Sequence, residues 1–173
     1  MLGSLQTVPA EDRPDLLGTT VLAALPPLAQ VAPIDPDLAD TAAFCQAYGV
    51  TPQQSANCVI VAAKRGGQTS LVACVALATT RVDVNGFVRQ HLEARKVSFA
   101  PMDLAVAESH MEYGGITPFG LPSEWPVLVD AAVIAEAQVV VGSGIRGSKL
   151  VVPGGSLAEL PTAQVLQGLA SGT

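Results

Sequence analysis

Two adjacent glycines with a proline shortly after them form the stretch of this sequence most suited to chemistry. The stretch reads Gly114-Gly115-Ile116-Thr117-Pro118-Phe119-Gly120. Glycine adopts positive φ and has no Cβ, so a ligand can approach the backbone and successive amide N–H groups can point into one concavity. Pro118 fixes its own φ and favours an extended Thr117, which makes the loop stiff. These residues could hold an anion or a polarised carbonyl oxygen; a tight connection between two packed elements is the alternative.

A second glycine-rich stretch, Gly142-Ser143-Gly144-Ile145-Arg146-Gly147, matches the spacing GxGxxG. A dinucleotide fingerprint needs a helix to open at the last glycine, so that its N-terminus meets the pyrophosphate. Here residues 148–152 read as a strand, and the order Ser148-Lys149 is the reverse of that in a phosphate-binding loop. We interpret the stretch as a hairpin turn, with Arg146 either structural or one wall of an anion-tolerant pocket.

Few side chains qualify as a nucleophile, a base or a metal ligand. No serine lies in a GxSxG elbow. Cys58 starts an apolar run with no base evident, which is typical of a small core residue, and His110 reads as a surface histidine rather than one that orients water. The three cysteines lack CxxC spacing and only two histidines are present. We therefore expect no disulfide framework, no metal and no cofactor.

The composition indicates a cytoplasmic protein without a membrane span. Hydrophobic residues make up 49% of the 173 residues, but no uninterrupted apolar run approaches the roughly 18 residues of a membrane helix. Acidic residues precede the apolar segment 16–32, whereas a signal peptide begins with basic ones. Residues 1–40 carry a net charge of -5 and the other 133 carry -1. This balance argues against binding a long stretch of nucleic acid, and we expect no DNA partner, but it permits a few phosphate contacts.

Apolar periodicity predicts the elements that must position these residues. Two apolar runs joined by Gly66-Gly67, at 57–63 and 70–78, predict a β-hairpin buried on both faces. The other predicted strands are 31–34 at a sheet edge, 96–100, 127–129, 137–141 and 150–152, with a weak element at 163–169. The predicted helices are 12–25, a helix capped by Asp37 or Asp40 that runs to Tyr48, 83–94 with His91 facing inward, and a turn after Pro101.

Strands interleaved with helices predict a single α/β domain over residues 1–173, with a mixed β-sheet and flanking helices. We find no repeat and no linker long enough to divide the chain. Residues 1–10 and 171–173 are expected to fray, as chain ends without anchoring contacts do.

Together these pieces resemble the YbaK/ProX family of aminoacyl-tRNA editing domains over about residues 37–160. The loop 114–120 resembles the family's Gly-Gly-x-Ser/Thr-Pro-x-Gly loop. Val129-Asp130-Ala131 is similar to its strand-end aspartate and residues 141–147 to its glycine-rich hairpin. Residues 83–97 also resemble the family's passage from helix to strand. Four such motifs in the right order are more specific than any one of them.

The resemblance implies a freestanding deacylase that acts in trans, hydrolysing the ester between a wrong amino acid and the 3′ end of a tRNA. In the family, the backbone at the first loop glycine, here Gly114, helps to position ester and water without a metal or a nucleophilic side chain. A family lysine on the first hairpin strand contacts the terminal nucleotide, and this sequence has Asn57 there. The other residues implied in substrate binding are Cys58, Gly115, Thr117, Pro118, Asp130, Ser143, Gly144 and Arg146.

The expected partners are the 3′ end of a mischarged tRNA and an aminoacyl-tRNA synthetase. We expect Asn57, the loop 114–118 and the turn 142–147 to line one cleft. Loss of the lysine leaves a second hypothesis open, a non-catalytic module that holds a tRNA end, a nucleotide or an amino acid. An unrelated small-molecule enzyme on the same fold ranks third. Asn57 is the feature that separates the first two hypotheses.

Overall fold

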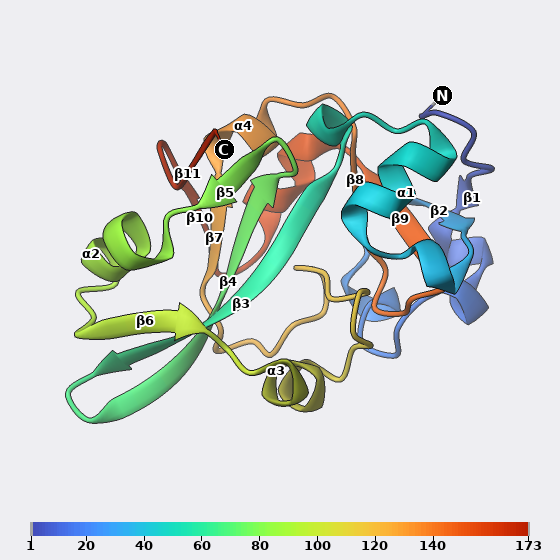
Figure 1. Ribbon diagram of the computed structural model, residues 1–173. Coiled ribbons are helices and arrows are strands. Elements are labelled where there is room, and N and C mark those ends of the chain that lie inside the picture. The colour runs from blue at the N-terminus through green and yellow to red at the C-terminus, as the bar shows by residue number, and fades with distance from the viewer. Residues whose placement is uncertain (1, 173) are drawn as a thin grey trace.

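Two main β-sheets and a two-stranded ribbon make up the computed structural model, which describes residues 2–172 (Figure 1). The four-stranded sheet has the order β1 (Val8–Pro9), β2 (Gln30–Pro33), β9 (Ser148–Val152) and β8 (Val139–Gly142). The five-stranded sheet has the order β10 (Ala163–Leu166), β7 (Val127–Asp130), β4 (Gln68–Leu77), β3 (Ala56–Arg65) and β6 (Lys96–Phe99). The ribbon pairs β11 (Ala170–Gly172) with β5 (Thr80–Val82).

Short helices flank these sheets. They are α1 (Thr41–Tyr48), α2 (Arg89–His91), α3 (Met102–Ser109) and α4 (Ala131–Ile134), and a π-helical turn at Val84–Val88 leads into α2. Further 3₁₀ turns occur at Ala10–Asp12, Pro14–Leu16, Leu22–Ala24, Pro36–Leu38, Pro52–Gln54 and Gly154–Glu159. β7 runs parallel to β4 and β10, while β3 is antiparallel to its neighbours. The predicted α/β class with a mixed sheet and flanking helices is confirmed, although β8 and β9 belong to a separate antiparallel sheet.

The β3–β4 hairpin is the longest pairing in the fold and agrees with its prediction. Gly66 and Gly67 have φ of 57° and 77°, and positive φ at both central residues is what a tight two-residue hairpin turn requires. Val61 lies opposite Val72, and both side chains are buried. At its start β3 also reaches the other sheet, because Ser55 forms a bridge with Val140 of β8. The two main sheets therefore meet at the beginning of β3.

Alternate residues of β3 enter two different cores. Ala56 and Ile60 belong to the cluster between the two main sheets. Val61 and Ala63 belong to a second cluster on the opposite face, with Val59 packed against it. Because successive strand residues point to opposite faces, Asn57 projects to the side of Val59 and Val61. This alternation decides which β3 side chains face the candidate site.

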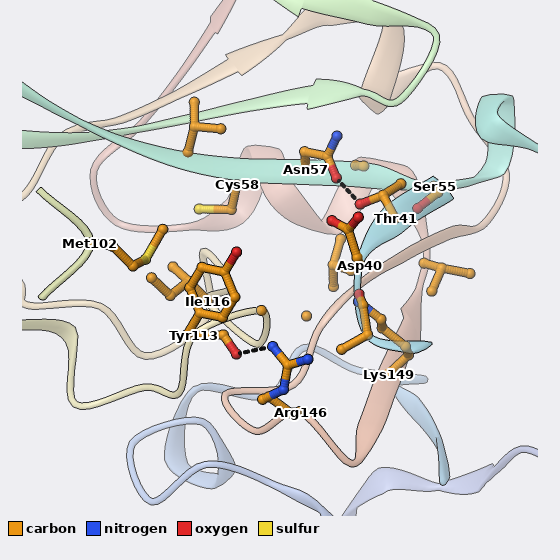
Figure 2. A pocket seen from close by; sticks show the side chains of 17 residues that line it. Asp40, Thr41, Ser55, Asn57, Cys58, Met102, Tyr113, Ile116, Arg146 and Lys149 are labelled. Carbon is orange, nitrogen blue, oxygen red and sulfur yellow. Dashed lines mark hydrogen bonds between the residues drawn. The ribbon is translucent and has the colours of Figure 1, made fainter. Parts of the chain in front are cut away.

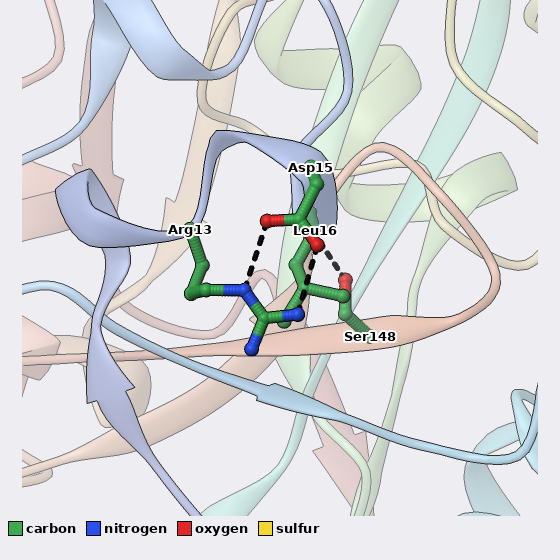
Figure 3. A network of polar contacts seen from close by, with 4 residues as sticks. All are labelled: Arg13, Asp15, Leu16 and Ser148. Atoms are coloured by element: carbon green, nitrogen blue, oxygen red, sulfur yellow. Dashed lines mark hydrogen bonds and ion pairs between the residues drawn. The ribbon is translucent and has the colours of Figure 1, made fainter.

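The predicted helix at 12–25 is wrong, because tertiary hydrogen bonds replace the intrahelical ones. Gly18 interrupts the apolar stripe, and its N–H donates to the carbonyl of Ser143 over 2.8 Å. Ser148 Oγ donates to the carbonyl of Leu16 over 2.5 Å, beside an exposed ion pair of Arg13 and Asp15 (Figure 3). Two short 3₁₀ turns and a bend result. Hydrogen bonds thus hold this segment against the β8–β9 hairpin.

The chain ends are more ordered than we expected for residues 1–10 and 171–173. Leu2 and Leu5 are buried in a cluster with Phe44, and Ser4 N–H donates to the carbonyl of Tyr48. At the other end, residues 170–172 pair with β5. Burial of apolar side chains supplies the anchoring that the sequence pattern did not reveal. Met1 and Thr173 lie outside the described residues.

Several local predictions agree with the structure and two need correction. Asp83 accepts from the N–H groups of Gly86 and Phe87, so it caps its helix as predicted. His91 is exposed rather than inward, since it lies in a very short helix and Nε2 finds a polar partner in Gln164 at 2.7 Å. β2 was predicted at a sheet edge, but it pairs with β1 on one side and with β9 on the other. Pro33 is tolerated because it lies beyond the end of β1, where no N–H is needed. Within residues 2–172, no helix has the length and apolar character to cross a membrane.

Candidate functional site

A cleft of about 560 Å³ opens where the two main sheets meet (Figure 2). Its walls are the start of β3, the N-terminus of α1, the loop around Gly114 and the β8–β9 hairpin. Asn57, Gly114, Gly142 and Arg146 all line it. Asn57 of β3, the glycine loop and the glycine-rich turn thus line one cleft, as the sequence predicted.

The glycine loop is clamped to the hairpin by its backbone. Gly115 N–H donates to the carbonyl of Glu112, and the carbonyl of Gly115 accepts from Gly144 N–H over 2.7 Å. Gly142 packs so closely that a Cβ there would lie 2.6 Å from the carbonyl oxygens of Gly115 and Ile116. These backbone contacts fix the loop against the hairpin.

Gly114 itself has φ of 81°, a left-handed conformation that favours glycine. Among the described residues its N–H donates to no protein group, although it lines the cleft. A Cβ at this position would lie 2.6 Å from Nη1 of Arg146. The backbone here is therefore open to a ligand on one side and close to a cation on the other.

Arg146 is held in place by hydrogen bonds to neutral groups. Nη1 donates to the carbonyl of Tyr113 over 3.0 Å, and Nη2 donates to the carbonyl of Pro36 over 2.9 Å. The guanidinium carbon lies 5.4 Å from the centre of the Tyr113 ring. In residues 2–172 no carboxylate pairs with this guanidinium within 4.0 Å. Two neutral carbonyls fix the geometry, so the positive charge remains available to an anion.

Lys149 is a second cation in the cleft, which our sequence analysis did not assign to the site. It lies in β9 with only 8% of its surface exposed. Nζ donates to the carbonyl of Ala39 over 3.0 Å and lies 5.2 Å from the centre of the Phe44 ring. Burial lowers the pKa of the ammonium from its usual value of 10.5. The signal for it in the sequence was a lysine placed directly before a strongly apolar strand.

Asp40 supplies the carboxylate of the cleft. It occupies the N-cap position of α1, one of two positions predicted for the cap, but its side chain caps no N–H group. Among the described residues the carboxylate accepts no hydrogen bond, and Figure 2 shows it between Thr41 and Lys149. A carboxylate free of structural duties is available to orient water.

Asn57 stands at the rim rather than inside the cleft. Its Oδ1 accepts a hydrogen bond from Thr41 Oγ1 over 2.6 Å. It points to the face of β3 opposite Cys58, as Figure 2 shows, and it also lines hollows beneath α1 and beside β5. Three depressions therefore meet at this one side chain.

Cys58 faces the cleft, but its chemistry is that of a core residue. Burial raises the pKa of the thiol, so the thiol stays protonated at neutral pH. Cys45 and Cys74 are also free thiols, and burial raises the pKa of both. For Cys74 it raises the pKa to about 12. No thiolate nucleophile is available at this site.

The remaining residues that the resemblance implied do not line the cleft: Gly115, Thr117, Pro118, Asp130, Ser143 and Gly144. Thr117 is fully buried, and Asp130 accepts from Ala132 N–H and Ala170 N–H. Ser143 and Ser148 share a hydrogen bond of 2.7 Å inside the hairpin. The lining instead includes Asp40, Thr41, Tyr113 and Lys149.

The arrangement as a whole suits an anionic ligand with a polarised carbonyl. Two cations without carboxylate partners, one free carboxylate and one free backbone N–H converge on a single cleft. Among the described residues, no group of three His, Cys, Asp or Glu side chains could hold a metal ion. Water activation and electrostatic stabilisation are the chemistry that these groups offer.

Comparison with known proteins agrees with this geometry. A family model described as an aminoacyl-tRNA editing domain matches residues 35–160, well over half of the chain. Two of the four motifs used in the sequence analysis, the glycine loop and the glycine-rich hairpin, supply walls of the cleft within that range.

Solved structures with the same fold share little sequence with this chain. A hypothetical protein is 19% identical with a TM-score of 0.72, over 83% of this chain and 91% of that one. A proposed trans-editing enzyme for prolyl-tRNA synthetase is 17% identical with a TM-score of 0.71, over 92% of this chain and 96% of that one. A chain from computational grafting of linear epitopes onto scaffold proteins is 17% identical, with a TM-score of 0.69, over 80% and 85% of the two chains.

Proposed function

The chain belongs to the aminoacyl-tRNA editing domain family, and from this premise we propose that it is a deacylase acting in trans on tRNA. It hydrolyses the ester that joins a wrong amino acid to the 3′ end of a tRNA. The observation that carries the proposal is the pair of cations, Arg146 and Lys149, that line one cleft and form no ion pair within 4.0 Å among the described residues. In a chain with a net charge of -6, such a cleft selects an anionic ligand.

In the proposed complex the terminal nucleotide lies between the two cations. Arg146 offers a planar guanidinium whose position is fixed by two carbonyls, and Lys149 offers a point charge from the floor of the cleft. The free N–H of Gly114 donates to the ester carbonyl oxygen. The aminoacyl group then extends toward Cys58, Met102 and Ile116, which form the less polar side of the cleft.

Hydrolysis then requires one water molecule and a proton acceptor. The water oxygen attacks the ester carbonyl carbon, and the bond from that carbon to the ribose oxygen breaks. Asp40 accepts a proton from the attacking water and returns it to the leaving ribose oxygen. The Gly114 N–H stabilises the negative charge that develops on the carbonyl oxygen. The products are a free amino acid and a tRNA with its terminal hydroxyl restored.

A second candidate, a non-catalytic binding module, is favoured by one observation. Asn57 is a neutral side chain held at the rim by Thr41, so the cleft lacks the positive charge that a lysine would bring to this position. Such a module would hold a tRNA end without cleaving its ester. The deciding experiment is deacylation measured over a panel of mischarged tRNAs at one fixed salt concentration. Binding without hydrolysis on every tRNA would favour the module.

Replacing Lys149 by methionine tests the cation that the proposal relies on. Hydrogen bonds to charged groups contribute about 1.5–3 kcal/mol, so we expect binding of an oligonucleotide with the tRNA 3′-end sequence to weaken roughly 10- to 150-fold. Folding should change little, because replacing a buried charge by an apolar side chain of similar size is often neutral or stabilising. Fluorescence anisotropy and thermal unfolding measure the two effects. Unchanged affinity would remove Lys149 from the site.

Asn57→Lys tests the departure from the family pattern. A charged donor in place of a neutral amide is expected to gain around 1–2 kcal/mol, which corresponds to roughly a 5- to 30-fold higher kcat/KM for deacylation. Ala56→Lys is the matched variant, since it adds the same charge to the opposite face of β3. A gain found only with Ala56→Lys would place the missing cation on the cleft face and contradict the assignment to position 57.

A further inference from the structure

Basic residues of this acidic chain are concentrated in one short segment. Residues 64–96 hold six of the nine lysines and arginines but only two of the fifteen acidic residues. Four of the six, Lys64, Arg65, Arg95 and Lys96, lie where the end of β3 meets the start of β6. We call these four residues the basic corner. In Figure 1 this end of the sheet projects away from β8 and β9.

The basic corner carries a local electrostatic cost. Lys64 and Lys96 are direct partners in the β3–β6 register, and like charges opposite each other destabilise a sheet. All four side chains are exposed. Within residues 2–172 a single carboxylate approaches them, Glu93, which lies 3.5 Å from Arg65. An external polyanion would relieve this repulsion, whereas the clustered positive charges do not stabilise the fold itself.

A path of suitable side chains connects the cleft with the basic corner. Asn57 and Val59 line the cleft and also the hollow beside β5, which is further lined by Arg81 and Phe99. Phe99 is 64% exposed in a chain with few aromatic residues. It lies opposite Val61, on the face of the sheet that Asn57 and Val59 share. Lys64 and Lys96 project from the other face, where β6 is the edge strand. From Asn57 to Lys64 the strand spans about 23 Å, a distance of several nucleotides.

We propose that the strip formed by Arg81, Phe99 and the basic corner is a docking surface for RNA, which takes the part of the tRNA beyond its terminal nucleotide. This inference rests on the proposed function, because it starts from a tRNA end in the cleft. The unpaired end crosses the rim at Asn57 and Val59, and a base stacks on Phe99. The phosphate backbone then passes round the edge strand β6 and meets the four cations of the corner.

The negative charge of the rest of the chain favours one orientation of the bound RNA. Outside residues 64–96 the chain holds thirteen acidic and three basic residues, a net charge of -10. RNA approaching any other face is repelled, so the strip steers the polyanion toward the cleft. A free amino acid or a single nucleotide would gain nothing from a charged surface this far from the cleft.

The test compares Lys64→Gln/Lys96→Gln with the wild-type chain in tRNA binding from 50 to 300 mM salt. Each lost phosphate contact lowers the salt slope of log affinity by about 1, and at 0.1 M salt it weakens binding about 5- to 8-fold. Hydrolysis of an aminoacylated adenosine, which reaches only the cleft, is expected to stay unchanged. Thermal stability is expected to hold or rise, because the like-charge pair is removed.

The matched control is Gln6→Glu/Arg13→Gln, which makes the same change of -2 in net charge on the N-terminal segment. The control variant should show the same salt slope as the wild-type chain. An unchanged slope in the lysine variant, or an equal loss in the control, would overturn the docking surface and leave the proposed function standing. If the wild-type chain neither binds tRNA nor acts on the aminoacylated adenosine, both proposals fail.

Discussion

Gly114→Val is expected to lose deacylation by a factor of about 100 to 1,000, the usual effect of removing one backbone-type donor from a developing oxyanion. At φ of 81° a β-branched side chain is strained, and its Cβ would lie 2.6 Å from Nη1 of Arg146. The loop N–H and the guanidinium must therefore both move. We would measure single-turnover hydrolysis of a mischarged tRNA alongside thermal unfolding.

Gly67→Val controls for the backbone strain in that experiment. Gly67 has φ of 77° in the β3–β4 turn, and a Cβ there meets nothing within 4 Å. Both variants should lose about 1–3 kcal/mol of stability because both force a side chain into a left-handed conformation, and Gly114→Val should lose more because its Cβ also meets Arg146. Only Gly114→Val should lose activity. Full activity in a folded Gly114→Val variant would show that the loop N–H plays no part in the reaction.

Asp40→Asn should lower kcat about 100- to 10,000-fold, the range expected for a general acid–base group. The Asp40 side chain caps no N–H group of α1, so the helix should remain intact. Binding of a non-hydrolysable amide analogue of the aminoacyl end should persist. The measurement pairs single-turnover rates with a binding titration of that analogue.

Asp37→Asn is the matched control, since it removes the same charge three residues earlier, outside the cleft. It should retain the wild-type rate. An Asp40→Asn variant that deacylates normally would move the proton acceptor elsewhere. A variant that also fails to bind the analogue would instead indicate that Asp40 shapes the site rather than activating water.

Local sequence patterns were enough to predict the elements that depend on only a few neighbouring residues. Gly66 and Gly67 dictate a hairpin because two adjacent residues with positive φ close a tight turn between apolar runs. Gly49, with φ of 67°, ends the helix that runs to Tyr48, and Asp83 caps its own helix through neighbouring N–H groups. The glycine loop and the glycine-rich turn were recognisable for the same reason. Each depends on contacts within a few residues.

The residues that face each other across the cleft are brought together by the packing of the two sheets. Residues 12–25 have a helical pattern, yet hydrogen bonds to Ser143 and Ser148 hold them in turns. Lys149 and Asp40 became site residues because β9 and the start of α1 happen to face each other there, 109 positions apart in the chain. The outward direction of Asn57 follows from strand register. Contacts between distant segments depend on how sheets pack, and no local pattern of side chains encodes that.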